Sequence, residues 1–197
     1  MDLDPNLLSR RDAYALMTSL VVPRPIGWIS TLSGQGHPNL APFSFFGGVS
    51  SHPPLVSLAI GRRRGEPKDT AANLLETGEA VVHICHRPLA EAMVLTSAEV
   101  DPAEDEFELA GLARASASTV RPHRIRDAAI ALEAEVERHL LVGEGGTDLF
   151  LLHVLHVHVD DAFVVDGRVD PARLRAVGRL GGTAYCDTAA VFDIPRP

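Results

Sequence analysis

A two-residue alternation, interrupted only by Ala131, runs through residues 130–137, although most of the residue types there favour helices. Acidic residues alternate with apolar ones, and the apolar positions are Ile130, Leu132, Ala134 and Val136. A period of two is that of a strand, whereas a helix repeats about every 3.6 residues. The glycine-rich segment 143–147 predicts a hairpin loop, and the β-rich run 148–159 predicts a long returning strand.

The first half of the chain carries short apolar segments separated by turn residues. They predict strands at 26–32, 37–43, 55–61 and 79–85. The first two are joined by a Ser-Gly-Gln-Gly turn at 33–36, which predicts a second hairpin.

Three helices are predicted around these strands, at 9–20, 70–77 and 88–97. Ser9 is a candidate N-cap, Gly78 ends the second helix, and Pro88 begins the third. The apolar side chains at helical spacing are Ala13, Leu16, Met17 and Leu20, then Leu74 and Leu75, then Leu89 and Met93.

Many antiparallel strands with few helices predict a mainly β fold, a small closed barrel with peripheral helices packed outside. The length of 197 residues suits one domain, taken as 1–197. Residues 98–128 are rich in Asp, Glu, Pro and Arg and have no sustained period. This composition predicts a helical or loop excursion over the surface.

Composition excludes several functions. The net charge of −8 argues against sequence-independent nucleic-acid binding, which needs a basic face. The arginine cluster at 62–64 is then either a solvated loop or a local anion site.

No stretch approaches the roughly 20 apolar residues of a membrane span, and the N-terminus lacks a signal-peptide pattern. Cys85 and Cys186 lie far apart in sequence, which fits a reducing compartment, so we expect a cytoplasmic protein.

Lys68 is the only lysine, because 17 of the 18 basic residues are arginine. It lies in the first turn of a predicted helix, where free backbone N–H groups and the helix dipole favour an anion. A lysine binds phosphate as a point charge. The alternative is an ordinary solvated lysine.

Other candidates have plain structural interpretations. His153, His156 and His158 could indicate a metal, but a strand cannot make all three converge, so semi-buried histidines are favoured and no metal is expected. His83 and Cys85 share a strand face, where core filling is favoured over a redox role. The acidic cluster between 99 and 108 lacks calcium-loop spacing and is read as a solvated face.

Seven segments in order resemble the flavin reductase-like, FMN-binding split-barrel family. They are RPIGWIST (24–31), NLAPFSFF (39–46), SHPPL (51–55), KDTAAN (68–73), LTSA (95–98), DEFELAGL (105–112) and VGRLGG (177–182). The resemblance covers about residues 14 to 185. It implies an antiparallel Greek-key split β-barrel and a homodimer, with FMN held at the interface by contacts from both chains.

The resemblance also implies cofactor-binding residues. The ring and ribityl chain would be lined by Ser30, Thr31, Asn39, Ala41, Pro42, Phe43 and Ser44, and Ser50 is a further candidate. The phosphate end would be held by Lys68, Asp69, Thr70 and Asn73, while Thr96 and Ser97 would approach from the second half of the pattern. Arg179 and Tyr185 either lie near the flavin or nicotinamide or pack on the surface.

The implied activity is hydride transfer from NADH or NADPH to FMN, with electrons passed on to a small-molecule or protein acceptor. No catalytic acid–base residue is expected, because the cofactor carries the chemistry. Gly47 and Thr183 replace asparagines that many relatives carry, and Val142-Gly143-Glu144-Gly145 stands where short-chain reductases have Gly-Asp-His. The chain therefore looks like the flavoredoxin-type branch. Alternatives are an FMN electron carrier without NAD(P)H activity and a dimer that has lost the cofactor.

Overall fold

The structure, a computed structural model, describes residues 2–195. Seven antiparallel strands form one sheet in the order β3-β2-β6-β9-β10-β5-β4. Their bounds are β2 Gly27–Leu32, β3 Pro38–Phe43, β4 Phe46–Ser51, β5 Pro54–Gly61, β6 Glu79–Ile84, β9 Ile130–Val142 and β10 Thr147–Val159. The fold is mainly β, as the sequence predicts.

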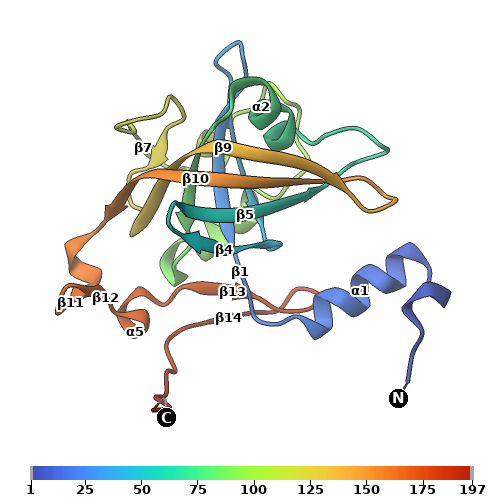
Figure 1. The fold of residues 1–197 in the computed structure, drawn as a ribbon. Helices are drawn as coiled ribbons and strands as arrows, with labels where there is room; N and C mark the ends of the chain where they lie inside the picture. The colour runs from blue at the N-terminus through green and yellow to red at the C-terminus, as the bar shows by residue number, and fades with distance from the viewer. Residues whose placement is uncertain (1, 196–197) are drawn as a thin grey trace.

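The sheet curls into a split barrel. Its two edge strands, β3 and β4, stand at opposite ends of the sheet order but are joined by only two residues, Ser44 and Phe45. The backbone N–H of Ala59 on β5 donates to the Phe45 carbonyl at 2.9 Å, which ties this connection to the barrel. In Figure 1, α2 (Asp69–Thr77) covers the upper end of the barrel, whereas α1 (Arg10–Leu20) and the strands β13 (Val177–Arg179) and β14 (Tyr185–Asp187) lie below it.

The long hairpin of β9 and β10 confirms the two-residue alternation as a strand signal. The two strands pair from Ile130 to Val142, with irregularities between Leu151 and Leu152 and between Val154 and His156. Gly143 and Gly146 in the loop have φ values of +71° and +67°, a region that glycine enters without steric cost. Helix propensity in this segment is overridden by the pairing of β9 with β10 on one side and with β6 on the other.

The strand β4 was not predicted. Residues 46–51 lie outside the predicted strands, because Gly47 and Gly48 lower the β propensity of this segment. In the structure β4 pairs with β5 from Phe46↔Leu58 to Ser51↔Pro54. Pairing with a neighbouring strand therefore outweighs the local preference.

The first two predicted helices begin and end within a residue of where the capping signals place them, whereas the helix predicted at 88–97 forms as two shorter helices that together span 87–95. The bounds are α1 Arg10–Leu20, α2 Asp69–Thr77, η2 Arg87–Leu89 and α3 Ala90–Leu95. Ser9 accepts a hydrogen bond from the N–H of Asp12 at 3.2 Å, and Gly78 has the left-handed φ of +73°. None of the helices within residues 2–195 has both the length and the apolar character that a membrane crossing requires.

One expectation about a helix face was wrong, namely that Leu75 faces inward together with Leu74. Leu74 is buried between α2 and the barrel, but Leu75 is 46% exposed, because the turn of the helix leaves Ala71 and Leu74 as the pair facing the barrel. On α1, the predicted helix is present, and its apolar residues Met17 and Leu20 are exposed.

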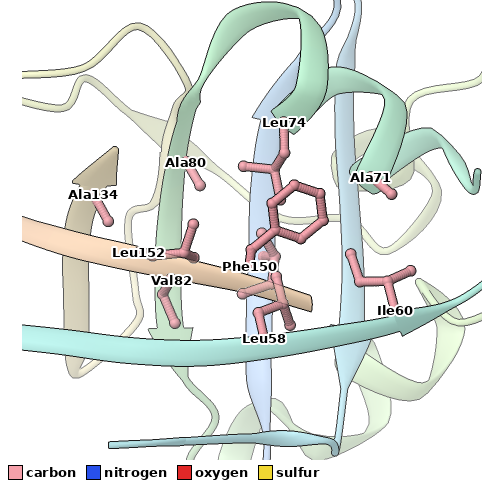
Figure 2. Packing of buried hydrophobic residues seen from close by; sticks show 10 residues of the cluster. Leu58, Ile60, Ala71, Leu74, Ala80, Val82, Ala134, Phe150 and Leu152 are labelled. Atoms are coloured by element: carbon pink, nitrogen blue, oxygen red, sulfur yellow. The ribbon is translucent and has the colours of Figure 1, made fainter. Parts of the chain in front are cut away.

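Two apolar clusters hold the barrel together. One lies inside it, where Leu58, Phe150 and Leu152 converge beneath Leu74 of α2 (Figure 2). The other lies against the outer side of β2 and includes Trp28, Leu40, Met93, Phe107 and Ile125. The first cluster fixes α2 over the barrel end, and the second fixes α3 beside β3.

The excursion at 98–128 is anchored in the core at two points. It contains α4 Glu106–Leu109, β7 Arg114–Ala115 and β8 Arg124–Ile125, and the side chains of Phe107 and Ile125 are fully buried. The excursion therefore contributes Phe107 and Ile125 to the apolar cluster outside β2.

The tail completes the fold. It comprises η3 Asp161–Phe163, β11 Val164–Val165, β12 Arg168–Val169, α5 Pro171–Leu174, β13 Val177–Arg179 and β14 Tyr185–Asp187, while η1 Pro5–Leu7 precedes α1. A second sheet has the order β1-β13-β14, with β1 at Arg24–Pro25. The tail therefore pairs with the segment that leads from α1 into the barrel.

Charged residues also contribute to the architecture. Arg62 makes two 2.9 Å hydrogen bonds to the fully buried carboxylate of Asp148, with His139 Nε2 at 2.8 Å from the same group. The hydrogen bonds from Arg62 hold the pKa of Asp148 below its usual value. Arg62 is therefore a structural ion-pair residue rather than part of a solvated loop.

Glu133 is fully buried on the β9 face that the alternation assigns to acidic residues. It accepts hydrogen bonds from the N–H groups of Ser118 (2.6 Å) and Thr119 (2.5 Å), and His158 Nε2 lies 2.5 Å away. Burial acts to raise the pKa of Glu133, but these hydrogen bonds outweigh it and lower the pKa to about 2. Glu133 therefore fastens the excursion to the barrel as a carboxylate.

We predict that Glu133→Gln lowers the free energy of unfolding by about 2–3 kcal/mol at pH 7. Because the folded pKa lies below the ordinary value of 4.5, this stabilisation is complete above pH 4.5 and is lost as the pH falls towards 2. Urea unfolding of both proteins between pH 7 and pH 3 measures the difference. Glu137→Gln, an exposed position on the same strand, is the matched control. A pH-independent difference would contradict the assignment.

Candidate functional site

The free edge of β3 has few backbone donors. The backbone N–H of Leu40 points away from β2 and donates to Glu106 Oε2 at 3.0 Å. Backbone groups alternate in direction along a strand, so those of every second residue of β3 point outward at this edge. The other outward positions are Pro38 and Pro42, which have no N–H. The edge is therefore a poor partner for another strand and forms one wall of a cleft.

This cleft, which we name the α2 cleft, has a volume of about 310 Å³. Its walls are β3, the segment leading into α2, and residues 96–100 together with Glu106. Nine of the sequence-predicted site residues line it: Asn39, Ala41, Pro42, Phe43, Lys68, Asp69, Thr70, Thr96 and Ser97. The structure thus brings together segments that are far apart in the sequence.

The start of α2 is uncapped. Lys68 is the N-cap residue and makes no side-chain capping bond, and within residues 2–195 no side chain accepts from the N–H groups of Asp69, Thr70 or Ala71. Lys68 is in none of the ion pairs of the described chain. Free N–H groups, a helix dipole and an ammonium therefore converge at one end of the cleft, an arrangement that suits an anion.

A buried polar network fixes α2 against the β2–β3 hairpin. Asn39 Nδ2 donates to Thr70 Oγ1 at 2.8 Å, and Asn73 Nδ2 donates to Thr31 Oγ1 at 3.0 Å. All four side chains are buried. Asn39 and Thr70 form part of the cleft wall, whereas Thr31 and Asn73 lie outside its lining.

Thr96, on the cleft wall across from α2, is held in place by two hydrogen bonds. Its hydroxyl accepts from Trp28 Nε1 and donates to the carbonyl of Met93, both at 2.9 Å, and the side chain is buried. Ser97 is exposed and donates to the carbonyl of Val94 at 2.6 Å. Thr96 therefore positions the segment 96–100, and Ser97 is the residue of the two that a ligand can reach.

Sequence reasoning missed four charged residues of the cleft: Arg63, Glu66, Glu99 and Glu106. Arg63 and Glu99 form an exposed ion pair at 2.8 Å, and Glu106 is buried rather than part of a solvated acidic face. Burial raises the pKa of Glu106, although the hydrogen bond from Leu40 opposes that shift. The sequence feature that could have indicated a buried Glu106 is its position next to the apolar Phe107 in the segment 105–112.

A second cavity, which we name the α1 groove, has a volume of about 610 Å³. It lies between α1, the strands β1 and β3, and the tail segment 179–185. The α1 groove shares Pro42, Phe43 and Ser97 with the α2 cleft, so the two cavities adjoin along one wall. Ser44 lines the α1 groove.

Four of the predicted site residues line neither cavity: Thr31 and Asn73 of the buried polar network, and Ser30 and Ser50. Ser30 is buried on β2, and its hydroxyl has no hydrogen-bond partner within the described chain. Ser50 is exposed on β4 and accepts from the N–H of His52 at 3.2 Å. Arg179 and Tyr185 line the α1 groove, with the Arg179 guanidinium 4.4 Å from the centre of the Tyr185 ring.

His83 and Cys85 are core residues. His83 Nδ1 lies 2.9 Å from the Trp28 carbonyl, and His83 Nε2 accepts from the N–H of Ile125 at 2.9 Å. Burial lowers the pKa of His83 to about 4 and raises the pKa of the Cys85 thiol to about 12. Neutral His83 therefore joins β2 to the excursion, and the Cys85 thiol is a poor nucleophile.

The histidines of β10 also have structural partners. The His158 ring contacts Glu133, and His153 Nδ1 lies 3.7 Å from Glu135. The rings of His156 and His158 are edge to face, with centres 4.6 Å apart. These side chains thus lie on the β9–β10 hairpin, outside both cavities.

Comparison with known proteins identifies the class. The family model described as "flavin reductase like domain" matches residues 17–169, and the chain belongs to this family. A protein of Halalkalibacterium halodurans is 38% identical to it, over 100% of this chain and 97% of its own length.

Solved structures agree with this assignment. Nitrilotriacetate monooxygenase component B from Bacillus cereus superposes with a TM-score of 0.93 and 32% identity, covering 98% of this chain and 99% of its own. The 2-nitrobenzoate 2-nitroreductase NbaA from Pseudomonas fluorescens superposes with a TM-score of 0.91 and 27% identity, covering 100% of this chain and 96% of its own. The flavoredoxin of Desulfovibrio vulgaris shares the fold, with a TM-score of 0.76 at 19% identity and coverage of 100% and 97%. The split-barrel prediction is confirmed.

Proposed function

We propose that this protein is an FMN-binding oxidoreductase that takes a hydride from NADH or NADPH and passes electrons to a second acceptor, a small molecule or a protein. The observation that carries the proposal is the uncapped start of α2 beside the only lysine, at the end of a cleft. Family membership and the likeness to a monooxygenase component at 32% identity support a flavin-dependent redox role.

The residues present fit FMN. Three unbonded N–H groups and the Lys68 ammonium suit a dianionic phosphate. Ala41, Pro42 and Phe43 offer an apolar wall for a planar ring, and the two adjoining cavities fall in the size range of cofactor sites.

The residues of the cleft would act by holding the cofactor or by keeping the walls of its site in position. Lys68, Asp69 and Thr70 would hold the phosphate, and β3 would face the ring, while Asn39, Thr31 and Asn73 keep α2 in place. When bound, FMN would supply the ring that accepts a hydride. The chain's own contribution would be orientation and exclusion of water, with no acid–base residue assigned.

We further propose a homodimer with the cofactor at its interface. Exposed apolar side chains of α1 and its C-terminal end that lie outside the α1 groove support this: Met17, Leu20, Val21 and Val22. Apolar surface gathered on one element favours burial against a partner. Light scattering should give twice the chain mass of 21.1 kDa, and Leu20→Asp should lower it. A monomeric wild type would refute the assembly.

Lys68→Ala should weaken FMN binding about tenfold or more while sparing the fold, because it removes a charge-assisted contact worth about 1.5–3 kcal/mol. A fluorescence titration of FMN measures the dissociation constant. Arg138→Ala, which removes an exposed cation from β9, is the control and should bind as the wild type does. Equal dissociation constants for all three proteins would remove Lys68 from the phosphate site.

Steady-state oxidation of NADH and NADPH with added FMN tests the reductase activity. We expect turnover with at least one of the two nucleotides. The loop 142–145, which lacks the Gly-Asp-His signature, favours one rival, a flavoredoxin-like electron carrier without NAD(P)H activity. No turnover with either nucleotide, in protein that binds FMN, would establish that rival instead.

A further inference from the structure

The two adjoining cavities differ sharply in charge. The α2 cleft is lined by Arg63 and Lys68 but also by four carboxylates, Glu66, Asp69, Glu99 and Glu106. The α1 groove is lined by Arg11, Arg24 and Arg179 and by no acidic residue. In a chain of net charge −8, a cavity with three cations and no carboxylate is an unusual local composition.

Arg24 is a buried cation without a counter-ion. Only 4% of it is exposed, and its guanidinium donates to neutral acceptors: the carbonyls of Thr18, Val21 (2.8 Å) and Leu180 (3.0 Å) and the hydroxyl of Ser44 (3.2 Å). These bonds tie α1, β1 and the tail together, but they leave the charge uncompensated. An uncompensated buried charge raises the affinity of the adjoining space for an anion.

Ser44 adds a directed donor. Its oxygen accepts from Arg24 Nε, and its own hydroxyl hydrogen has no acceptor among residues 2–195. Because Ser44 lines the α1 groove, this hydrogen is available to a ligand there. A hydroxyl that accepts from a guanidinium is polarised and becomes a better donor.

The remaining two arginines are also free of carboxylates. Arg179 donates to the Tyr185 hydroxyl and, at 2.5 Å, to the carbonyl of Gly182, and it stacks on the Tyr185 ring. The arginines that form ion pairs in the described chain are Arg62, Arg63, Arg114, Arg121 and Arg175, and none of them lines this groove. Three guanidinium groups without a carboxylate partner therefore line this one groove.

We propose that the α1 groove binds an organic anion, through a carboxylate or phosphate group held by Arg11, Arg179 and the Ser44 hydroxyl. Guanidinium groups suit both anions, because their fork of N–H groups matches paired oxygens. The volume of about 610 Å³ exceeds that of an inorganic ion, and Tyr14 and Phe43 offer faces for a planar group. Its placement beside a flavin, as the second substrate, rests on the proposed function; the anion recognition does not.

Isothermal titration calorimetry with benzoate and with NADP⁺, each with and without FMN, tests the site. At least one anion should bind the wild type, and benzamide, the neutral analogue of benzoate, should bind more weakly than benzoate. Arg11→Gln and Arg179→Gln should each weaken the anion about tenfold. Arg10→Gln, on the same helix but outside the groove lining, should leave the affinity unchanged. Circular dichroism confirms that each variant is folded.

The outcomes separate this site from the proposed function. Binding of benzoate identifies a carboxylate ligand, and binding of NADP⁺ alone identifies a phosphate ligand. Protein that binds FMN but neither anion, or an Arg10→Gln variant as impaired as Arg11→Gln, overturns the anion site and leaves the flavin proposal intact. Protein that binds no FMN but still loses anion affinity in Arg179→Gln overturns the flavin proposal alone.

Discussion

The arrangement of the candidate site depends on the hydrogen bond between Asn39 and Thr70. It joins the edge strand of the barrel to the first turn of α2, and Thr31 and Asn73 extend it into a buried network. At the other end of the helix, Glu76 accepts from the N–H of Gly34 in the hairpin loop at 2.9 Å. Satisfied buried networks of this kind favour a single geometry, because each broken bond would leave a polar group unpaired. The cleft wall and the anion-attracting helix start are thereby held in one relative position.

The site is divided between two cavities that share a wall of Pro42 and Phe43. One cavity offers a single ammonium and free helix N–H groups among carboxylates, whereas the other offers guanidinium groups alone. An apolar partition between two differently charged spaces suits a planar cofactor with a phosphate at one end and a separate anionic reactant at the other. The fold creates this division because β3, at the free edge of the sheet, contributes to both spaces.

Local signals predicted what depends on sequence neighbours. Ser9 and Gly78 act as the capping rules require, and the two-residue alternation of apolar and acidic residues at 130–137 lies in a strand, as the local period indicates. The sequence could not show that Glu106 is buried, since its partner Leu40 lies 66 positions away. Nor could it show that a loop of the excursion covers Glu133. The ordered motifs assigned residues of β3 and of the start of α2 to one binding site. The division of the surrounding space into two cavities could not be predicted, because the α1 groove is completed by the tail segment 179–185, whose path is set by the fold.

The two prolines of β3 have a consequence for the behaviour of the molecule in concentrated solution. An exposed strand edge normally acts as a template on which a neighbouring molecule adds a strand, and repeated addition leads to fibrils. With Pro38 and Pro42 lacking N–H groups and the Leu40 N–H already bonded to Glu106, this edge offers no free donor to an incoming chain. The protein can thus keep one side of its barrel open to ligands without seeding its own polymerisation.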